Sequence, residues 1–258
     1  MTDSLFWIHR DQIYAKGLDL GFSAFSAGHL IWLAAIAVSA YMAGRLYRSL
    51  PEKGRADMRG ILALATVLLE AAKVIVMGLY QVNTLEFIPL HLCSVGGLSI
   101  LIYALWPGRW KLDQLFGYAF FPAALLAVAF PSTGMYPWLN FYCIHTFVYH
   151  ALIICFFVML YMSGEFRPTY RGLLFSFAFV ALFAVPIYLL DGAFRVNYMF
   201  IGMRSDVGLL QLFWDKLAVP YGRPVYTLVL GGIFFATIHV LHLIYVLMGK
   251  VGTLRKKA

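Results

Sequence analysis

Charged residues are scarce in this chain. They make up 12% of its 258 residues, whereas hydrophobic residues make up 62%, and soluble globular proteins average about 25% charged residues. The mean hydropathy of +0.79 points the same way. This composition excludes an ordinary soluble domain. It predicts an all-α polytopic membrane protein, because helices can satisfy their backbone polar groups inside lipid.

The short motifs of common soluble enzymes are also missing. The chain has three cysteines, all expected within apolar spans, and no CxxC pair, so no disulfide framework is predicted. Walker, GxGxxG, HExxH and GxSxG motifs do not occur, and no cofactor is therefore expected. Residues 1–22 lack the basic start and apolar core of a signal peptide. Their aromatic residues favour a short interfacial segment.

Long apolar stretches are what the sequence does contain. Crossing the hydrocarbon core of about 30 Å takes about 20 helical residues. Seven stretches approach or exceed that length, and the fourth is the shortest: 23–47, 60–80, 87–106, 115–130, 139–162, 173–190 and 225–248. The sequence therefore predicts a seven-helix membrane domain over 23–248, with an outer connection at 191–224 and a basic tail at 249–258.

The basic residues predict the orientation of this bundle. Thirteen of the 20 lysines and arginines flank the first, third and fifth connections or lie in the tail. By the positive-inside rule these segments are cytoplasmic, which puts the N-terminus outside, the C-terminus inside, and 81–86 and 191–224 outside. The net charge of +8 then reflects topology and anionic lipid, not nucleic acid. A multi-pass protein of the cell membrane is expected, with membrane phospholipids as its partners.

Ionisable residues inside the predicted spans are the main functional candidates, because burying them in lipid is costly. With a rise of about 1.5 Å per residue, four spans place such a group about 9–10 Å below the outer end. These groups are His29, Lys73, Cys93 and His145. Glu70 and His150 follow at about 15 Å, and His91 lies at about 6 Å.

Helix geometry limits which of these groups can meet. His91 and Cys93 are two residues apart and cannot face each other, so Cys93 needs a partner from another helix. His145 matches its depth, but His150, about 140° further round the same helix, stays an alternative. Glu70 and Lys73 at i,i+3 can form an ion pair on one face. Each histidine also has a structural interpretation, as a hydrogen-bonding residue between helices.

Four features together resemble the YwaF / transmembrane protein 164 family of integral membrane proteins. They are the Glu70 to Lys73 span, residues 89–93 (PLHLC), the helix of His145, and residues 197–200 (NYMF). The resemblance extends from about residue 23 to the last span. It implies a seven-helix protein whose eukaryotic relatives are associated with acyl transfer onto ether phospholipids. It also implies a cysteine and a histidine working within the membrane, here Cys93 and a histidine of the fifth span.

The chemistry of such a site is consistent with the polar layer. A thiol attacks an ester carbonyl as the thiolate, which burial disfavours, so a neighbouring base such as His145 or His150 is required. The tetrahedral oxyanion then needs donors, for which Lys73, Asn140 and Asn197 are candidates by depth. His91 and Tyr198 complete the predicted supporting residues. The connection 191–224 is interpreted as a lid over the outer mouth, or alternatively as an amphipathic loop on the headgroups.

A second lipid hydroxyl would take the acyl group from the thioester, whereas attack by water would make the protein a lipid hydrolase with the same cysteine nucleophile. Two other classes of function stay open. A seven-helix metal hydrolase, in the manner of alkaline ceramidases, would use histidines as zinc ligands. His239 and His242 have a suitable i,i+3 spacing, but two ligands alone do not make a zinc site. A transporter or lipid-handling scaffold would use the same polar layer as a binding site, although the spans show no inverted repeat.

Overall fold

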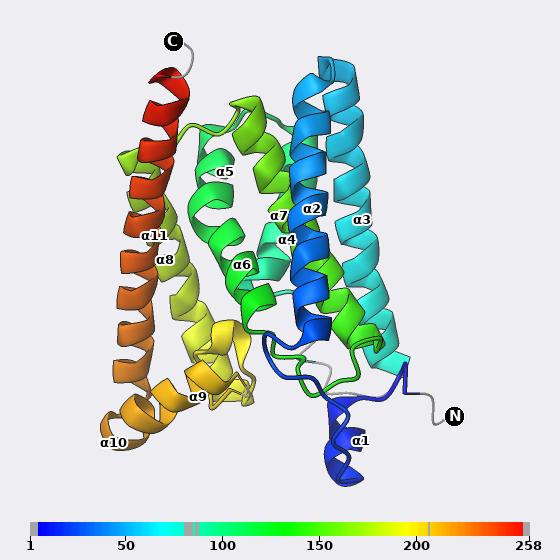
Figure 1. Cartoon of the computed structure of the whole chain (residues 1–258). Coiled ribbons are helices and arrows are strands. Elements are labelled where there is room, and N and C mark those ends of the chain that lie inside the picture. Colours follow the sequence, from blue (N-terminus) through cyan, green and yellow to red (C-terminus); the bar gives the residue numbers. More distant parts are fainter. Residues whose placement is uncertain (1–4, 80–84, 86–87, 206, 255–258) are drawn as a thin grey trace. The chain divides into compact units, whose positions relative to one another are not determined.

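The computed structural model describes residues 5–79, 85, 88–205 and 207–254 (Figure 1). Every regular element in that part of the chain is a helix. The helices form two compact units. Unit 1 comprises Met1–Pro107 and Ala123–Ser163, and unit 2 comprises Gly108–Pro122 and Gly164–Ala258. The predicted outer connection 81–86 lies outside the described residues except for Leu85, and the end of the tail, 255–258, lies outside them as well.

Six helical stretches of the described chain are long and apolar enough to cross a membrane. They begin and end within a few residues of the predicted spans, except that the second begins earlier. The stretches are α2 (Ala27–Ser49), α3 (Glu52–Leu79), the run Trp110–Ala129, α7 (Phe141–Ser163), α8 (Tyr170–Phe194) and α11, which extends over Arg223–Leu254. The protein is therefore a helical membrane protein.

The third predicted span differs from the others. Its helix, α4, covers only Leu92–Leu105, 14 residues, which is about 21 Å of helix at about 1.5 Å per residue. Pro89 keeps the helix from extending back through residue 88, because proline disfavours helical backbone in the residue before it and supplies no N–H. Hydropathy alone extends this span back to Phe87, which lies outside the described residues.

The fourth predicted span is longer than expected. α5 (Trp110–Leu115), the π-helical segment Phe116–Phe120 and α6 (Phe121–Ala129) follow one another without a break. The resulting 20-residue stretch begins before the apolar run that hydropathy detects. All five residues of the π-helical segment are buried, so this irregular backbone lies within packed protein, where its polar groups can be satisfied.

In unit 1, α2 packs along α7, and α3 packs on α4 and α7. Close approach of α2 to α7 depends on Gly44, since a Cβ atom there would overlap the side chains of Met162 and Val158. Trp32 of α2 stacks on Phe147 of α7, with ring centroids 5.1 Å apart. Small residues and aromatic stacking thus replace the hydrophobic driving force that helices lack in lipid.

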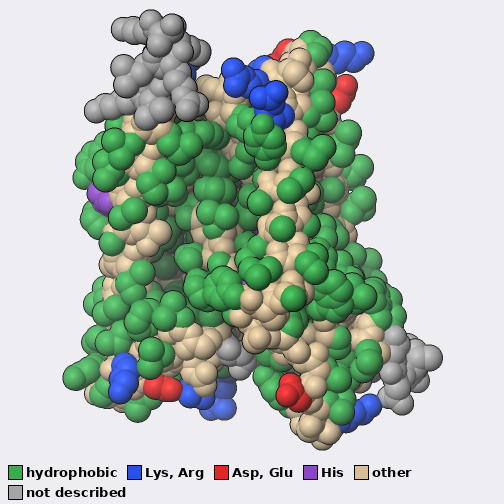
Figure 2. Space-filling model, viewed as in Figure 1, with side chains coloured by type: hydrophobic (Ala, Val, Ile, Leu, Met, Phe, Trp, Pro, Cys, Tyr) green, Lys and Arg blue, Asp and Glu red, His purple; other side chains and the backbone are tan. Residues whose placement is uncertain are grey.

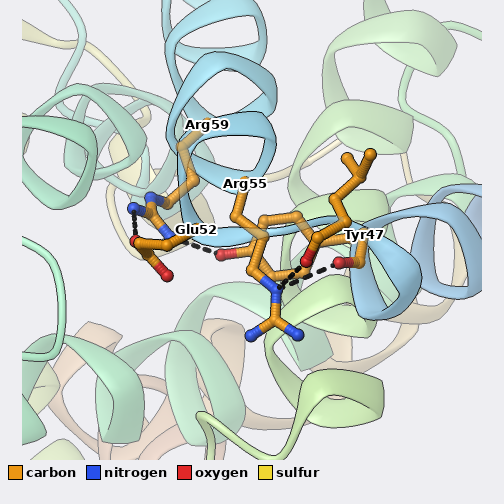
Figure 3. A network of polar contacts seen from close by, with 5 residues as sticks. Tyr47, Glu52, Arg55 and Arg59 are labelled. Carbon is orange, nitrogen blue, oxygen red and sulfur yellow. Dashed lines mark hydrogen bonds and ion pairs between the residues drawn. The ribbon is translucent and has the colours of Figure 1, made fainter.

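A network of polar contacts holds the turn between α2 and α3 (Figure 3). Arg59, only 3% exposed, donates to the Tyr47 hydroxyl at 2.6 Å and to Glu52 at 2.7 Å. Arg55 donates through Nε to the carbonyl oxygens of Tyr47 and Leu50. These contacts add side-chain donors to carbonyls at the end of α2, where the backbone N–H of Leu50 also donates to Tyr47.

Unit 2 is built from α8, α11 and the helix containing α5 and the π-helical segment. Gln114 of α5 donates to the carbonyl of Arg167 at 2.9 Å. Gly172 of α8 lies so close to this side chain that a Cβ atom would overlap it. Tyr245 of α11 donates to the carbonyl of Gly117. Polar contacts therefore join all three helices.

The connection from α8 to α11 is compact and largely helical. α8 ends at Arg195 in the left-handed conformation, followed by η3 (Tyr198–Phe200), α9 (Gly208–Phe213), η4 (Trp214–Ala218) and α10 (Val219–Tyr221). Arg204 forms an exposed ion pair with Asp215, and this guanidinium lowers the pKa of the Asp215 carboxyl.

Charged and hydrophobic side chains are separated on the visible face of the protein. Figure 2 shows hydrophobic side chains along the helix flanks, with lysines and arginines near the helix ends, including the end formed by the α2–α3 turn. This is the distribution that a surrounding bilayer requires.

Candidate functional site

Unit 1 gathers ionisable and polar side chains from α3, from α4 and the residue before it, and from α7. Glu70 and Lys73 form the predicted ion pair on α3, and Glu70 is only 6% exposed. The Lys73 ammonium also acts electrostatically on the imidazoles of His91, His145 and His150. We call these residues, with Cys93 and Tyr149, the unit 1 cluster.

Tyr149 of α7 lies at the centre of this cluster. Its hydroxyl donates to the carbonyl of Ser94 at 3.3 Å and lies against Gly97, where a Cβ atom would overlap it. Its electrostatic neighbours include both Glu70 and Cys93. The side chain of Tyr149 is therefore a neighbour of both the thiol on α4 and the carboxylate on α3.

The backbone of α4 fits closely against its neighbours at this level. Thr66 of α3 donates to the carbonyl of Gly97 at 3.3 Å, and the Tyr149 hydroxyl covers the same residue from the α7 side. The Tyr149 contact requires a residue without a side chain at position 97. Gly97 thus lets three helices converge around the thiol.

Cys93 is the second residue of α4, because His91 is the N-cap. The thiol is free and half-buried. Backbone N–H groups in the first turn of a helix have no partner within the helix and favour negative charge nearby. This location favours a thiolate, whereas burial opposes it, so a proton acceptor close to the sulfur is still required.

The two histidines of α7 use different ring nitrogens to donate hydrogen bonds, so a different nitrogen is left as a base in each. His145 Nε2 lies 3.2 Å from the carbonyl of Leu69 on α3, and His150 Nδ1 lies 2.6 Å from the carbonyl of Thr146. A carbonyl only accepts, so these nitrogens carry the protons and leave Nδ1 of His145 and Nε2 of His150 as bases. The His145 ring also stacks on Tyr149, with centroids 5.4 Å apart.

Asn140 and His29 have other partners. The Asn140 amide donates to the carbonyls of Leu5 and Ile8, and its oxygen accepts from the backbone N–H of Tyr142. His29 contacts the carbonyl of Val128 and the backbone N–H of Phe25, each at 2.7 Å. Asn140 therefore ties the N-terminal segment to the start of α7, and both of its amide protons are in use.

Asn197 and Tyr198 belong to unit 2 and shape the turn after α8. Asn197 accepts from the backbone N–H groups of Gly202 and Met203. The backbone N–H of Tyr198 donates to Asp191. These bonds account for a compact turn. The lid interpretation of this connection stays a prediction.

The described residues contain no group of three or more His, Cys, Asp or Glu side chains that could hold a metal. His242 Nδ1 lies 2.5 Å from the Tyr118 hydroxyl. His239 contacts the Tyr170 hydroxyl at 3.4 Å and the carbonyl of Phe235. The i,i+3 histidine pair therefore forms two separate tyrosine contacts within unit 2.

Sequence reasoning overlooked Tyr149, Thr66 and Gly97. Tyr149 follows His145 by four residues, so helical spacing puts both rings on one face, and that signal could have been used. The contact between Gly97 and Tyr149 depends on how α4 packs on α7, which the sequence does not encode locally.

Comparison with known protein families identifies the family of this chain. The model of the family described as the TMEM164 family matches residues 24–248. No curated protein and no solved structure matches the chain.

Proposed function

Because the chain belongs to the TMEM164 family, we propose that it moves fatty acyl chains between membrane lipids through a thioester on Cys93. The observation that carries this proposal is the position of the free thiol, in the first turn of α4, among the side chains of the unit 1 cluster. It is a nucleophile at a helix N-terminus, in a cluster that also contains histidines, and both features activate cysteines.

The first half-reaction uses one histidine of α7. The imidazole takes the proton from the Cys93 thiol as the sulfur attacks the ester carbonyl of a phospholipid. The tetrahedral intermediate then collapses, the ester C–O bond breaks, and the same imidazole returns the proton to the departing lysolipid oxygen. The Lys73 ammonium is the candidate donor to the oxyanion. The acyl group is left on sulfur as a thioester.

Intact mass measurement tests this proposal. Purified protein incubated with a phospholipid of defined acyl chains is expected to gain the mass of one fatty acyl group, because the thioester is a covalent intermediate. Hydroxylamine should remove the added mass. The Cys93→Ala variant should show no adduct, while Cys155→Ala, a buried cysteine of α7, should behave as wild type.

Continued lipid turnover by Cys93→Ala would contradict the proposal. The nucleophile would then be water, as in the metal hydrolases, and metal analysis of the purified protein would follow. Absence of both the adduct and turnover in wild-type protein would favour a transporter or scaffold instead.

We further propose that α4 is a seventh, short transmembrane span in the cell membrane. The N-terminus then lies outside and the C-terminus inside. The positive-inside distribution of Lys and Arg supports this orientation. In a cysteine-free variant, a single cysteine at exposed Lys216 is expected to react with an impermeant thiol reagent added to intact cells. One at exposed Lys53 should react only after permeabilisation. The reverse pattern would overturn the orientation.

A further inference from the structure

Two cations of unit 2 lie over aromatic rings where α5 and α8 meet. The Arg171 guanidinium of α8 lies over the ring of Trp110 in α5, with Cζ 5.8 Å from the ring centroid. The Lys111 ammonium of α5 lies over the ring of Phe175 in α8, at 5.7 Å. The two rings are themselves in contact, with centroids 5.8 Å apart. Each helix therefore supplies the ring for the cation of the other.

The same segments carry more positive than negative charge. Four exposed cations lie just before α5 and α8 or within their first residues: Arg109, Lys111, Arg167 and Arg171. The acidic residues beside them are Asp113, which is buried, and Glu165, which is half-buried. Within the described part of the chain, none of the four cations forms an ion pair or donates a side-chain hydrogen bond. An anion from outside the protein can therefore bind them.

An apolar stripe leads away from Arg171 along α8. Its residues are exposed and recur every three or four positions, which puts them on one helix face. They are Leu174, Ala178, Leu182, Val185 and Leu189. From Arg171 to Leu182 the helix rises about 16 Å, which is about half of the hydrocarbon core of about 30 Å. One acyl chain of a single leaflet covers that length.

These features restrict the chemical class of the ligand. A guanidinium and an ammonium both donate to phosphate oxygens. The apolar stripe below Arg171 favours a phosphate that carries an acyl chain over a free phosphate ion. A zwitterionic headgroup brings its own ammonium group into a region with excess positive charge, whereas an anionic headgroup offsets that charge. An anionic phospholipid fits best.

We propose that Lys111 and Arg171 bind the headgroup of an anionic phospholipid, and that one of its acyl chains lies along the apolar stripe of α8. The ring contacts hold both cations in place before the lipid binds, which lowers the entropy lost on binding. In the orientation proposed above, this lipid belongs to the cytoplasmic leaflet. The site lies in unit 2, whereas Cys93 lies in unit 1, and the inference does not depend on acyl transfer.

Native mass spectrometry of the detergent-solubilised protein tests this site. Wild-type protein is expected to bind phosphatidylglycerol more tightly than phosphatidylcholine. In the double variant Lys111→Gln/Arg171→Gln, the Kd for phosphatidylglycerol should rise by about 30-fold, because each basic residue contributes about fivefold to the affinity for anionic lipid. Its Kd for phosphatidylcholine should change little. Trp110→Leu keeps both charges but removes one ring, and should show a smaller rise.

Arg45→Gln/Arg48→Gln is the matched control, because it removes two exposed cations of α2 that lie over no aromatic ring in the described structure. This variant should keep the wild-type Kd for phosphatidylglycerol. An equal rise in both double variants would show general attraction between charges and overturn the inference, as would a wild-type Kd in Lys111→Gln/Arg171→Gln. Inorganic phosphate in excess should not displace the lipid. Displacement would assign the site to a free phosphate ion and overturn the lipid assignment.

Discussion

His145→Ala is expected to slow acylation of Cys93 by about 10²–10⁴-fold, because a half-buried thiol among apolar helices requires a general base. The bond from Nε2 to the carbonyl of Leu69 fixes the ring and leaves Nδ1 to accept the proton. Stacking on Tyr149 holds the same ring against the residue that has Cys93 as an electrostatic neighbour. Single-turnover mass measurement of the thioester gives the rate.

Two other histidine variants are measured beside His145→Ala, one as a control and one as a test of the alternative base. His239→Ala removes an imidazole from unit 2 and should leave the acylation rate nearly unchanged. His150→Ala tests the alternative base, since its Nε2 is the unprotonated nitrogen. A large loss in His150→Ala with little loss in His145→Ala would transfer the role of the base to His150.

Asn140→Ala is expected to lower the free energy of unfolding by about 2–4 kcal/mol, because several buried backbone groups lose their partner at about 1–3 kcal/mol each. The carbonyls of Leu5 and Ile8 lose a donor and the N–H of Tyr142 loses an acceptor. The N-terminal segment should then detach from α7. Thermal unfolding in detergent and limited proteolysis of the first 20 residues would measure both effects.

Asn140→Asp is the informative control, because it keeps an oxygen for Tyr142 but has no N–H for Leu5 and Ile8. Its stability should fall at least as far as that of Asn140→Ala, because the second carboxylate oxygen would face the two carbonyl oxygens. The acylation rate, measured below the unfolding temperature, should change little in either variant. A large loss of that rate at unchanged stability would show instead that Asn140 stabilises the oxyanion.

The sequence predicts the helical fold well because hydropathy and length depend on local composition. Most of the long helices begin and end within a few residues of the predicted spans, and the ion pair of Glu70 with Lys73 follows from its i,i+3 spacing. α4 was predicted too long because hydropathy continues through residues 87–91 and outweighs the effect of Pro89. The helix through Phe116–Phe120 was predicted too short because its first turn is polar.

The candidate site is only partly predictable, for a different reason. Depth along a helix indicates which polar groups lie at one level, but it does not tell which backbone carbonyls or N–H groups face them. Asn140 has a plausible depth for an oxyanion donor, yet its donors meet the carbonyls of Leu5 and Ile8. The sequence did not single out Tyr149 as a functional residue, because aromatic residues in membrane spans usually serve only in side-chain packing.

The length of α4 has a consequence for the bilayer itself. A helix of about 21 Å is about 9 Å shorter than the hydrocarbon core. Such hydrophobic mismatch is relieved by local thinning of the membrane. With α4 as a span in the proposed orientation, lipids beside its first turn would carry their ester groups deeper than lipids elsewhere. The shortened helix would then lower the glycerol backbone of a neighbouring lipid toward Cys93, and the thiol would not need to lie at the membrane surface.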